Sequence, residues 1–142
     1  MKSKLILVCA AVAISLFLLA CSPSAKQVSV EASCDDFTEL QHISKEVQVD
    51  IGDSFTVALC SNPTTGFQWS ESAQISAPTI LQQTQHEYVP PEAEGVVGAP
   101  GKEVWTFEAL EKGTCSVSME YSRPWEGGEE GAWTFTLTVI VK

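Results

Sequence analysis

The sequence predicts an all-β protein, an immunoglobulin-like antiparallel β-sandwich with three loops gathered at one end. Three observations predict this class. Apolar and polar residues alternate over several short runs, which is the period of strands that bury one face. Gly, Pro and Asn fall between these runs, where antiparallel strands need turns. No stretch beyond the N-terminal segment has the apolar stripe of an amphipathic helix.

The first residues are typical of a secretion signal. Lys2 and Lys4 precede an apolar run that ends at Ala20, which is shorter than the run of about 20 residues that a membrane-spanning helix needs. Its end, Leu18-Leu19-Ala20-Cys21, resembles the lipobox of bacterial lipoproteins, in which the Cys is lipidated and the chain is cut before it. The resemblance implies a signal peptide over residues 1–20 and a lipid anchor with palmitate on Cys21. The alternative is an ordinary cleaved signal with an incidental Cys.

Residues 21–42 are expected to be the lipidated N-terminus and a tether, because Ser22–Ser33 is polar and shows no sustained period. The lipid would hold the protein to a membrane of the cell envelope. Ser22 rather than Asp follows the Cys, which by resemblance to the lipoprotein sorting rule favours the outer membrane or the cell surface. Residues 43–142 are expected to form the sandwich domain.

Six runs of alternating residues place strands within this domain. The first two are separated by Gly52-Asp53 and are predicted to form a hairpin. Trp105 and Trp133 share the inward side of their runs and are predicted to be core residues. The inward positions are Val47, Val49 and Ile51; Phe55, Val57 and Leu59; Phe67 and Trp69; Trp105, Phe107 and Ala109; Val117, Met119 and Tyr121; and Trp133, Phe135, Leu137, Val139 and Val141.

Composition excludes several classes of function. The chain has 142 residues, 18 acidic and 8 basic side chains and a formal net charge of −10, with no cluster of Lys and Arg, so nucleic acid is not an expected partner. His42 and His86 have no Cys or carboxylate at ligand spacing, so no metal or cofactor is expected. The acidic residues gather in turns and no nucleophile signature is present, so no catalytic residue is assigned and an enzyme is not expected.

Three segments between strands are too ordered in composition to be generic turns. In Asn62–Phe67, Pro63 fixes its own φ and Gly66 can adopt a positive φ, so two threonines lie on a braced tip. Gly95–Gly101 is unusually apolar for a loop, and Tyr121–Glu126 places an Arg beside a Trp, as in interface hot spots. If the strands alternate in direction, every second connection emerges at the same end of the sandwich, and these three segments are predicted to form one wedge there.

At these three segments the sequence resembles the chagasin-like inhibitors of papain-like cysteine proteases, over roughly Val47–Lys142. The family has an immunoglobulin-like sandwich and three loops with motifs of the form N-P-T-T-G-aromatic, G-x-G-G and R-P-W. The first motif matches at Asn62–Phe67 and the third at Arg123–Trp125. The middle motif departs, because Pro100 stands where a third Gly is expected.

The resemblance implies a reversible protein inhibitor, a monomer, that occludes the active-site cleft of a papain-like cysteine protease. Thr64 and Thr65 would lie over the catalytic Cys and His of the target, with the other two loops gripping the sides of the cleft. A Trp125 folded back on its own sandwich is the alternative at that position. The implied protease-binding residues are Asn62, Pro63, Thr64, Thr65, Gly66, Phe67, Gly98, Gly101, Arg123, Pro124 and Trp125.

Two other classes of function stay open at this point. One is a lipid-anchored envelope binding or adhesion module, because immunoglobulin-like folds host many such roles. The other is a hydrolase that uses acidic loop residues.

The five cysteines can be assigned by the predicted strand order. Cys9 is lost with the signal and Cys21 carries the lipid, so three remain in the domain. Cys60 ends the second strand, while Cys115 begins the strand of Val117 and Met119 at the other end of the sandwich, about 20 Å away and too far for a bridge. Cys34 precedes the first strand, which would start beside Cys60 in a hairpin. The prediction is a Cys34–Cys60 disulfide and a buried free thiol at Cys115.

Overall fold

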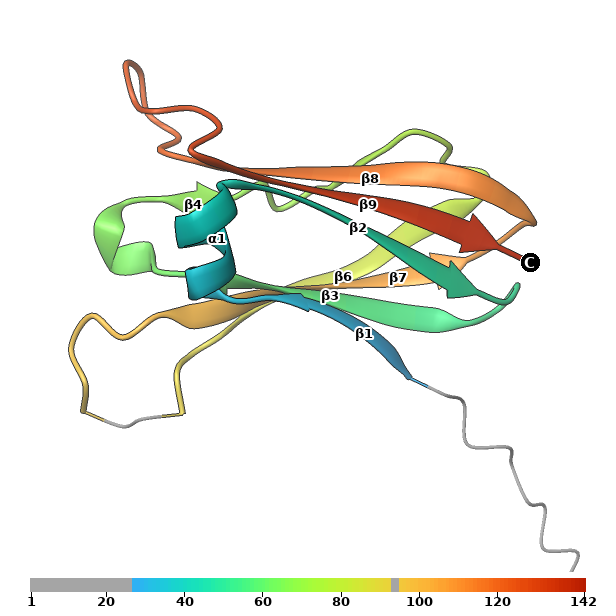
Figure 1. Ribbon diagram of the computed structural model, residues 1–142, viewed down its shortest axis with the longest axis horizontal. Helices are drawn as coiled ribbons and strands as arrows, with labels where there is room; N and C mark the ends of the chain where they lie inside the picture. The colour runs from blue at the N-terminus through green and yellow to red at the C-terminus, as the bar shows by residue number, and fades with distance from the viewer. Residues whose placement is uncertain (1–26, 93–94) are drawn as a thin grey trace, which may run out of the picture.

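The computed structural model describes residues 27–92 and 95–142 and consists of two β-sheets packed face to face (Figure 1). The predicted signal peptide and the predicted lipidation site, Cys21, lie outside the described residues. One sheet has the order β1 (Val28–Ala32), β3 (Ser54–Ser61), β7 (Gly101–Ala109), β6 (Leu81–Val89). The other has the order β2 (His42–Val49), β9 (Trp133–Val141), β8 (Gly113–Ser122), β4 (Gln68–Trp69), and β5 (Gln74–Ile75) also pairs with β8. The predicted β-sandwich is therefore confirmed.

The core lies between the sheets and follows the alternation seen in the sequence. In β9, Phe135, Leu137 and Val139 are fully buried while the threonines between them face outward. Trp105 is fully buried, and Trp133 is half-buried and packs against the core, so both are packing residues as predicted. None of the helices in residues 27–92 and 95–142 is long and apolar enough to cross a membrane.

The domain begins earlier than the sequence predicts. Residues 28–42 are folded rather than part of a tether, because β1 pairs with β3 and is followed by the helix α1 (Cys34–Leu40). Ser33 caps this helix: its backbone N–H donates to the carboxylate of Asp36, and its hydroxyl accepts from the Asp36 N–H. These hydrogen bonds lower the pKa of Asp36. The helix escaped prediction because Phe37 is its only buried residue, which makes no stripe.

Two further predictions about strand pairing are wrong. The first two predicted strands, β2 and β3, do not form a hairpin, because the turn at Gly52 carries the chain from one sheet to the other. The sheets are also not wholly antiparallel, since the edge strands β1 and β2 pair in parallel with β3 and β9. Ile51, predicted to extend the first strand inward, lies in the turn and is 54% exposed. Alternation reports which face a strand buries but not which neighbour it pairs with.

Strand β6 also has no counterpart among the six predicted runs. Only Leu81 of its nine residues is buried, and most of the others are polar. The strand forms one edge of its sheet, so it needs no alternation of apolar residues.

The predicted arrangement of the three cysteines in the domain is confirmed. Cys34 and Cys60 form a disulfide with their Cα atoms 5.1 Å apart, and Cys115 is free and buried. The bridge does not arise from the hairpin on which the prediction depended. It forms because β1 runs parallel to β3, which brings the start of α1 beside the end of β3.

Candidate functional site

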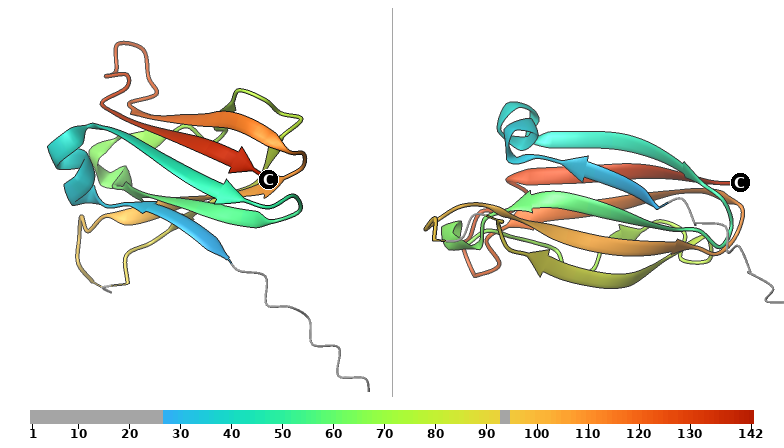
Figure 2. Two further views of the ribbon diagram at one scale, coloured as in Figure 1. Left: turned by 45° about the vertical axis from the view of Figure 1, so that its right-hand side comes forward. Right: turned by 90° about the horizontal axis from the view of Figure 1, so that it is seen from below.

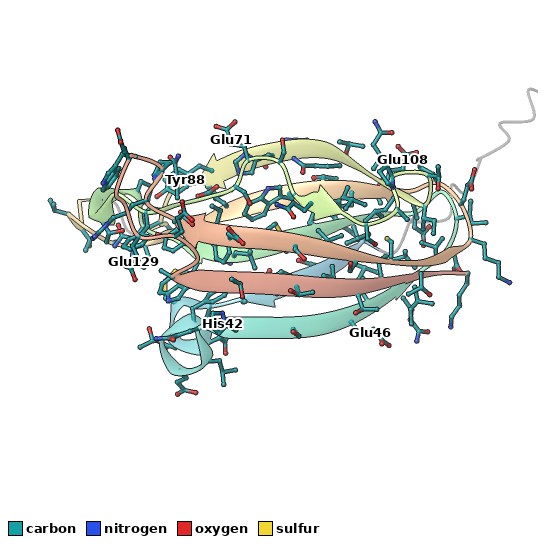
Figure 3. All side chains as sticks on the ribbon, turned by 90° about the horizontal axis from the view of Figure 1, so that it is seen from above. His42, Glu46, Glu71, Tyr88, Glu108 and Glu129 are labelled. Carbon is teal, nitrogen blue, oxygen red and sulfur yellow. A yellow bond between two sulfur atoms is a disulfide. The ribbon has the colours of Figure 1, made fainter. Side chains whose placement is uncertain are left out.

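Three loops emerge at the end of the sandwich where α1 lies, as predicted (Figures 1 and 2). The first loop, residues 62–67, follows β3 and contains the short 3-10 turn η1 (Pro63–Thr65). The second, residues 90–100, joins β6 to β7, and the third, residues 123–132, joins β8 to β9. In Figure 3, Tyr88 at the entry to the second loop and Glu129 of the third lie toward the same end. All the residues predicted to bind protease belong to this end.

The first loop is held in one shape by its own hydrogen bonds. The Asn62 side-chain oxygen accepts from the Thr64 N–H at 3.2 Å and from the Thr64 hydroxyl at 2.6 Å. The Thr65 hydroxyl donates to the Asn62 carbonyl at 2.7 Å. Gly66 closes the turn with a φ of +79°. Pro63, Thr64 and Thr65 are exposed, so the loop presents a braced tip to solvent.

Asn62 also ties the first loop to its neighbours. Its side-chain amide donates to the carbonyl of Gly98 in the second loop at 3.0 Å. Its backbone N–H donates to the hydroxyl of Tyr121, at the end of β8, at 2.9 Å. One side chain and one peptide group therefore fix the first loop relative to the second loop and to the base of the third.

The third loop packs against the first. The guanidinium carbon of Arg123 lies over the Phe67 ring, 4.3 Å from its centroid, and 5.9 Å from that of Trp125. The Trp125 ring rests against Gly66, where an added Cβ would be only 2.7 Å from the ring carbon Cη2. Trp125 is nevertheless 54% exposed. Of the two alternatives at this position, a Trp folded back on its own sandwich describes only part of the ring, which packs on the neighbouring loop and remains accessible.

The second loop offers a different kind of surface. Val96 and Val97 are 58% and 99% exposed, although their side chains are apolar. Gly98 has a φ of +81° and is exposed, whereas Gly101 is buried at the start of β7, against the backbone of Val89. The predicted site residue Gly101 thus permits close strand packing, and the exposed apolar surface of this loop belongs to the two valines. Their signal in the sequence was the apolar composition of this loop.

Below the loops lies a buried carboxylate, Glu103, that no motif in the sequence indicated. Glu103 of β7 accepts a hydrogen bond from the Ser61 hydroxyl at 2.7 Å and pairs with the His86 ring nitrogen Nε2 at 2.8 Å. The His86 ring stacks on Trp105 with centroids 4.9 Å apart. Glu103 lies on the same inward side of its strand as Trp105. A charged residue at an inward position was the one sign in the sequence that could have identified it. The cluster joins β3, β6 and β7 directly beneath the first two loops.

A hollow of about 410 Å³ separates the first and third loops from α1. Its lining is mostly apolar, and the buried Nε of Arg123 beside it has no hydrogen-bond acceptor among the described residues. No group of three metal-ligating side chains occurs in residues 27–92 and 95–142. This end of the sandwich thus combines an apolar hollow with the exposed side chains of Thr64, Thr65 and Trp125. The lining residues are Cys34, Asn62, Thr65, Phe67, Pro100, Tyr121, Arg123, Ala132 and Trp133.

The similarity of this chain to known proteins identifies its family. Residues 48–139 match the model of the chagasin family peptidase inhibitor I42. The chain belongs to the chagasin family of peptidase inhibitors. It is 33% identical to chagasin from Trypanosoma cruzi over 98 residues, which cover 68% of this chain and 88% of the relative. It is 28% identical to amoebiasin-2 from Entamoeba histolytica over 126 residues, 89% of this chain and 95% of the relative.

Solved structures show the same fold. The crystal structure of EhICP2, a cysteine protease inhibitor from Entamoeba histolytica, matches with a TM-score of 0.63 and 22% identity, covering 82% of this chain and 98% of that one. PbICP-C in complex with falcipain-2 matches with a TM-score of 0.60 and 14% identity, covering 81% and 99%. Membership of the chagasin family confirms the resemblance seen in the sequence and the expectation of an inhibitor rather than an enzyme.

Proposed function

We propose that this protein is a reversible inhibitor of papain-like cysteine proteases that occludes the active-site cleft with its three loops. The observation that carries the proposal is the hydrogen bonding of Asn62, which joins exposed tips into one pre-formed end. Loops that already hold the bound shape lose little conformational entropy on docking, so more of the contact energy appears as affinity.

The first loop is suited to lie over the catalytic Cys and His of a target. Its tip exposes Thr64 and Thr65, whose hydroxyls are already hydrogen-bonded to Asn62. A backbone held this firmly does not adapt to the extended shape that a protease needs for cleavage, so the loop resists cleavage. Blocking the cleft inhibits the protease without a covalent step. Val96 and Val97 on one side and Trp125 on the other supply exposed apolar surface to grip the walls of the cleft.

Titration of papain with the wild-type protein and two variants tests this proposal. Trp125→Ala removes a half-exposed aromatic anchor and is expected to raise the inhibition constant about 30-fold, the effect of losing a hot spot of about 2 kcal/mol. Ile51→Ala is the matched control, because Ile51 has the same 54% exposure but lies in the turn at the opposite end. Equal inhibition constants for the two variants, or no inhibition of several papain-like proteases by the wild type, would contradict the proposal and favour a binding or adhesion module.

We further propose that the protein acts as a monomer anchored to the cell envelope, on the outer membrane or cell surface, by a lipid on Cys21. The support is the order of a basic start, an apolar run and Leu18-Leu19-Ala20-Cys21.

Expression in bacteria fed labelled palmitate tests the anchor. The wild-type protein is expected to carry the label and to sediment with membranes, and Cys21→Ala is expected to lose both properties. Cys9→Ala is the control, because Cys9 lies inside the proposed signal peptide and should leave the labelling unchanged. Labelling that survives Cys21→Ala would overturn this assignment.

A further inference from the structure

A continuous stack of rings runs from α1 into the binding loops. Phe37 of α1 stacks on Trp133 with centroids 5.1 Å apart, and Trp133 stacks on Tyr121 at 4.8 Å. Tyr121 stacks on Phe67 at 5.3 Å, and the Arg123 guanidinium lies over the Phe67 ring. The stack therefore connects α1, β9 and β8 with the first and third loops.

The stack begins in a part of the chain that the family model does not cover. The match starts at residue 48, after α1 has ended at Leu40. Phe37 is nevertheless fully buried, between Trp69 at 5.2 Å and Trp133 at 5.1 Å, and fills the end of the sandwich beneath the loops. The helix that carries it is attached to the end of β3 by the Cys34–Cys60 disulfide.

Each contact in the stack bears on a loop residue. Trp133 is the first residue of β9, where the third loop returns to the sheet, so the Phe37 ring supports that end of the loop. Tyr121 lies at the other end of the same loop and its hydroxyl bonds the backbone of Asn62 in the first loop. Removing a ring from the stack therefore weakens the packing that holds both Phe67 and Arg123 in place.

We propose that α1 is a positioning element of the inhibitory end and that Phe37 is the positioning residue through which it acts. This inference rests on the proposed function. Phe37 touches no protease; it holds Trp133 and Tyr121, and through them Phe67, Arg123 and Trp125, in the orientation that binds. Without the ring, the entropy cost of ordering these side chains has to be met when the complex forms. The complex is then weaker and dissociates faster.

The test compares Phe37→Leu with Phe55→Leu in the full chain. Both residues are fully buried phenylalanines that stack on another aromatic ring, Phe55 on Phe107 at 5.4 Å, but Phe55 lies near the start of β3, away from the loops. Inhibition of papain is measured where both variants are fully folded. Phe37→Leu is expected to raise the inhibition constant roughly tenfold, mainly through a faster dissociation rate, and Phe55→Leu less than about twofold. Equal changes would overturn the proposal, because Phe37 would then act through stability alone.

Two further measurements separate the stack from the inhibitory function. Trp133→Phe keeps a ring in the stack and is expected to retain inhibition, whereas Trp133→Leu is expected to match Phe37→Leu. Hydrogen exchange of residues 62–67 and 123–132 should accelerate in Phe37→Leu and not in Phe55→Leu. If the wild type does not inhibit papain, the proposed function fails, and this exchange comparison still decides whether α1 orders the loops. Unchanged exchange in both loops would overturn the inference.

Discussion

Gly66→Ala is expected to raise the inhibition constant against papain about 150-fold, the equivalent of about 3 kcal/mol. A methyl group at this position would lie 2.7 Å from the Trp125 ring, so the ring must leave its seat on the first loop. The tip that carries Thr64 and Thr65 shifts at the same time, because Gly66 closes its turn. One added carbon thus disturbs two binding loops at once.

Gly52→Ala is the control that isolates this packing effect. Gly52 also has a positive φ, +86°, but nothing lies within 4 Å of an added Cβ, and the residue is in the turn at the opposite end. Both variants should lose about 1 kcal/mol of unfolding free energy from the left-handed backbone. Only Gly66→Ala should lose inhibition. A similar loss in both variants would show that backbone strain, and not the seat of Trp125, sets the affinity.

Replacing the disulfide with serines at Cys34 and Cys60 is expected to lower the free energy of unfolding by about 3 to 4 kcal/mol. The bridge closes a loop between residues 26 apart, and the chain-entropy relation for a loop of this size gives that magnitude. Urea denaturation of the wild type and the double variant measures the difference. The N-terminal segment of β1 and α1 is expected to lose its hydrogen-exchange protection first, since its covalent link to β3 is gone.

Cys115→Ala provides the matched control for thiol chemistry. Burial raises the pKa of the Cys115 thiol, which keeps it protonated and unreactive while the protein is folded. A reducing agent should therefore destabilise the wild type and Cys115→Ala by the same amount and leave the Cys34/Cys60 variant unchanged. Destabilisation of that last variant by reductant would contradict the assignment of the bridge.

Alternation of apolar and polar residues predicted the strands that bury one whole face against the core. It did not predict the strands β1 and β6, which bury only one or two side chains each. The inner strands β7, β8 and β9 bury every second residue, and their runs were found. The edge strand β6 buries Leu81 alone, so it left no pattern. In β1 the buried side chains are only Val30 and Ala32, a weak signal within a polar stretch. Alternation in a sequence therefore identifies strands that bury one face. Edge strands that bury few side chains are recognised only once their pairing in the structure is known.

The sequence predicted which residues make up the candidate site, but not the contacts that connect its loops. The motifs identified the exposed tips, because Pro63 and Gly66 prescribe a local backbone shape. The hub role of Asn62 depends on Gly98 and Tyr121, which lie 36 and 59 residues further along the chain. No local pattern contains such contacts. The ring stack from Phe37 is long-range for the same reason.

The parallel pairing of β1 with β3 gives the molecule a fixed polarity. Val28 lies beside Phe55, at the far end from Asn62, so the chain enters the domain at the pole opposite the loops (Figure 1). With a lipid on Cys21, the seven residues from Cys21 to Gln27 reach at most about 25 Å, and β3 adds about 26 Å of height. The inhibitory tips then face away from the bilayer, roughly 25 to 50 Å above it. Under the proposed lipid anchor, the loops would meet proteases that reach the membrane from solution.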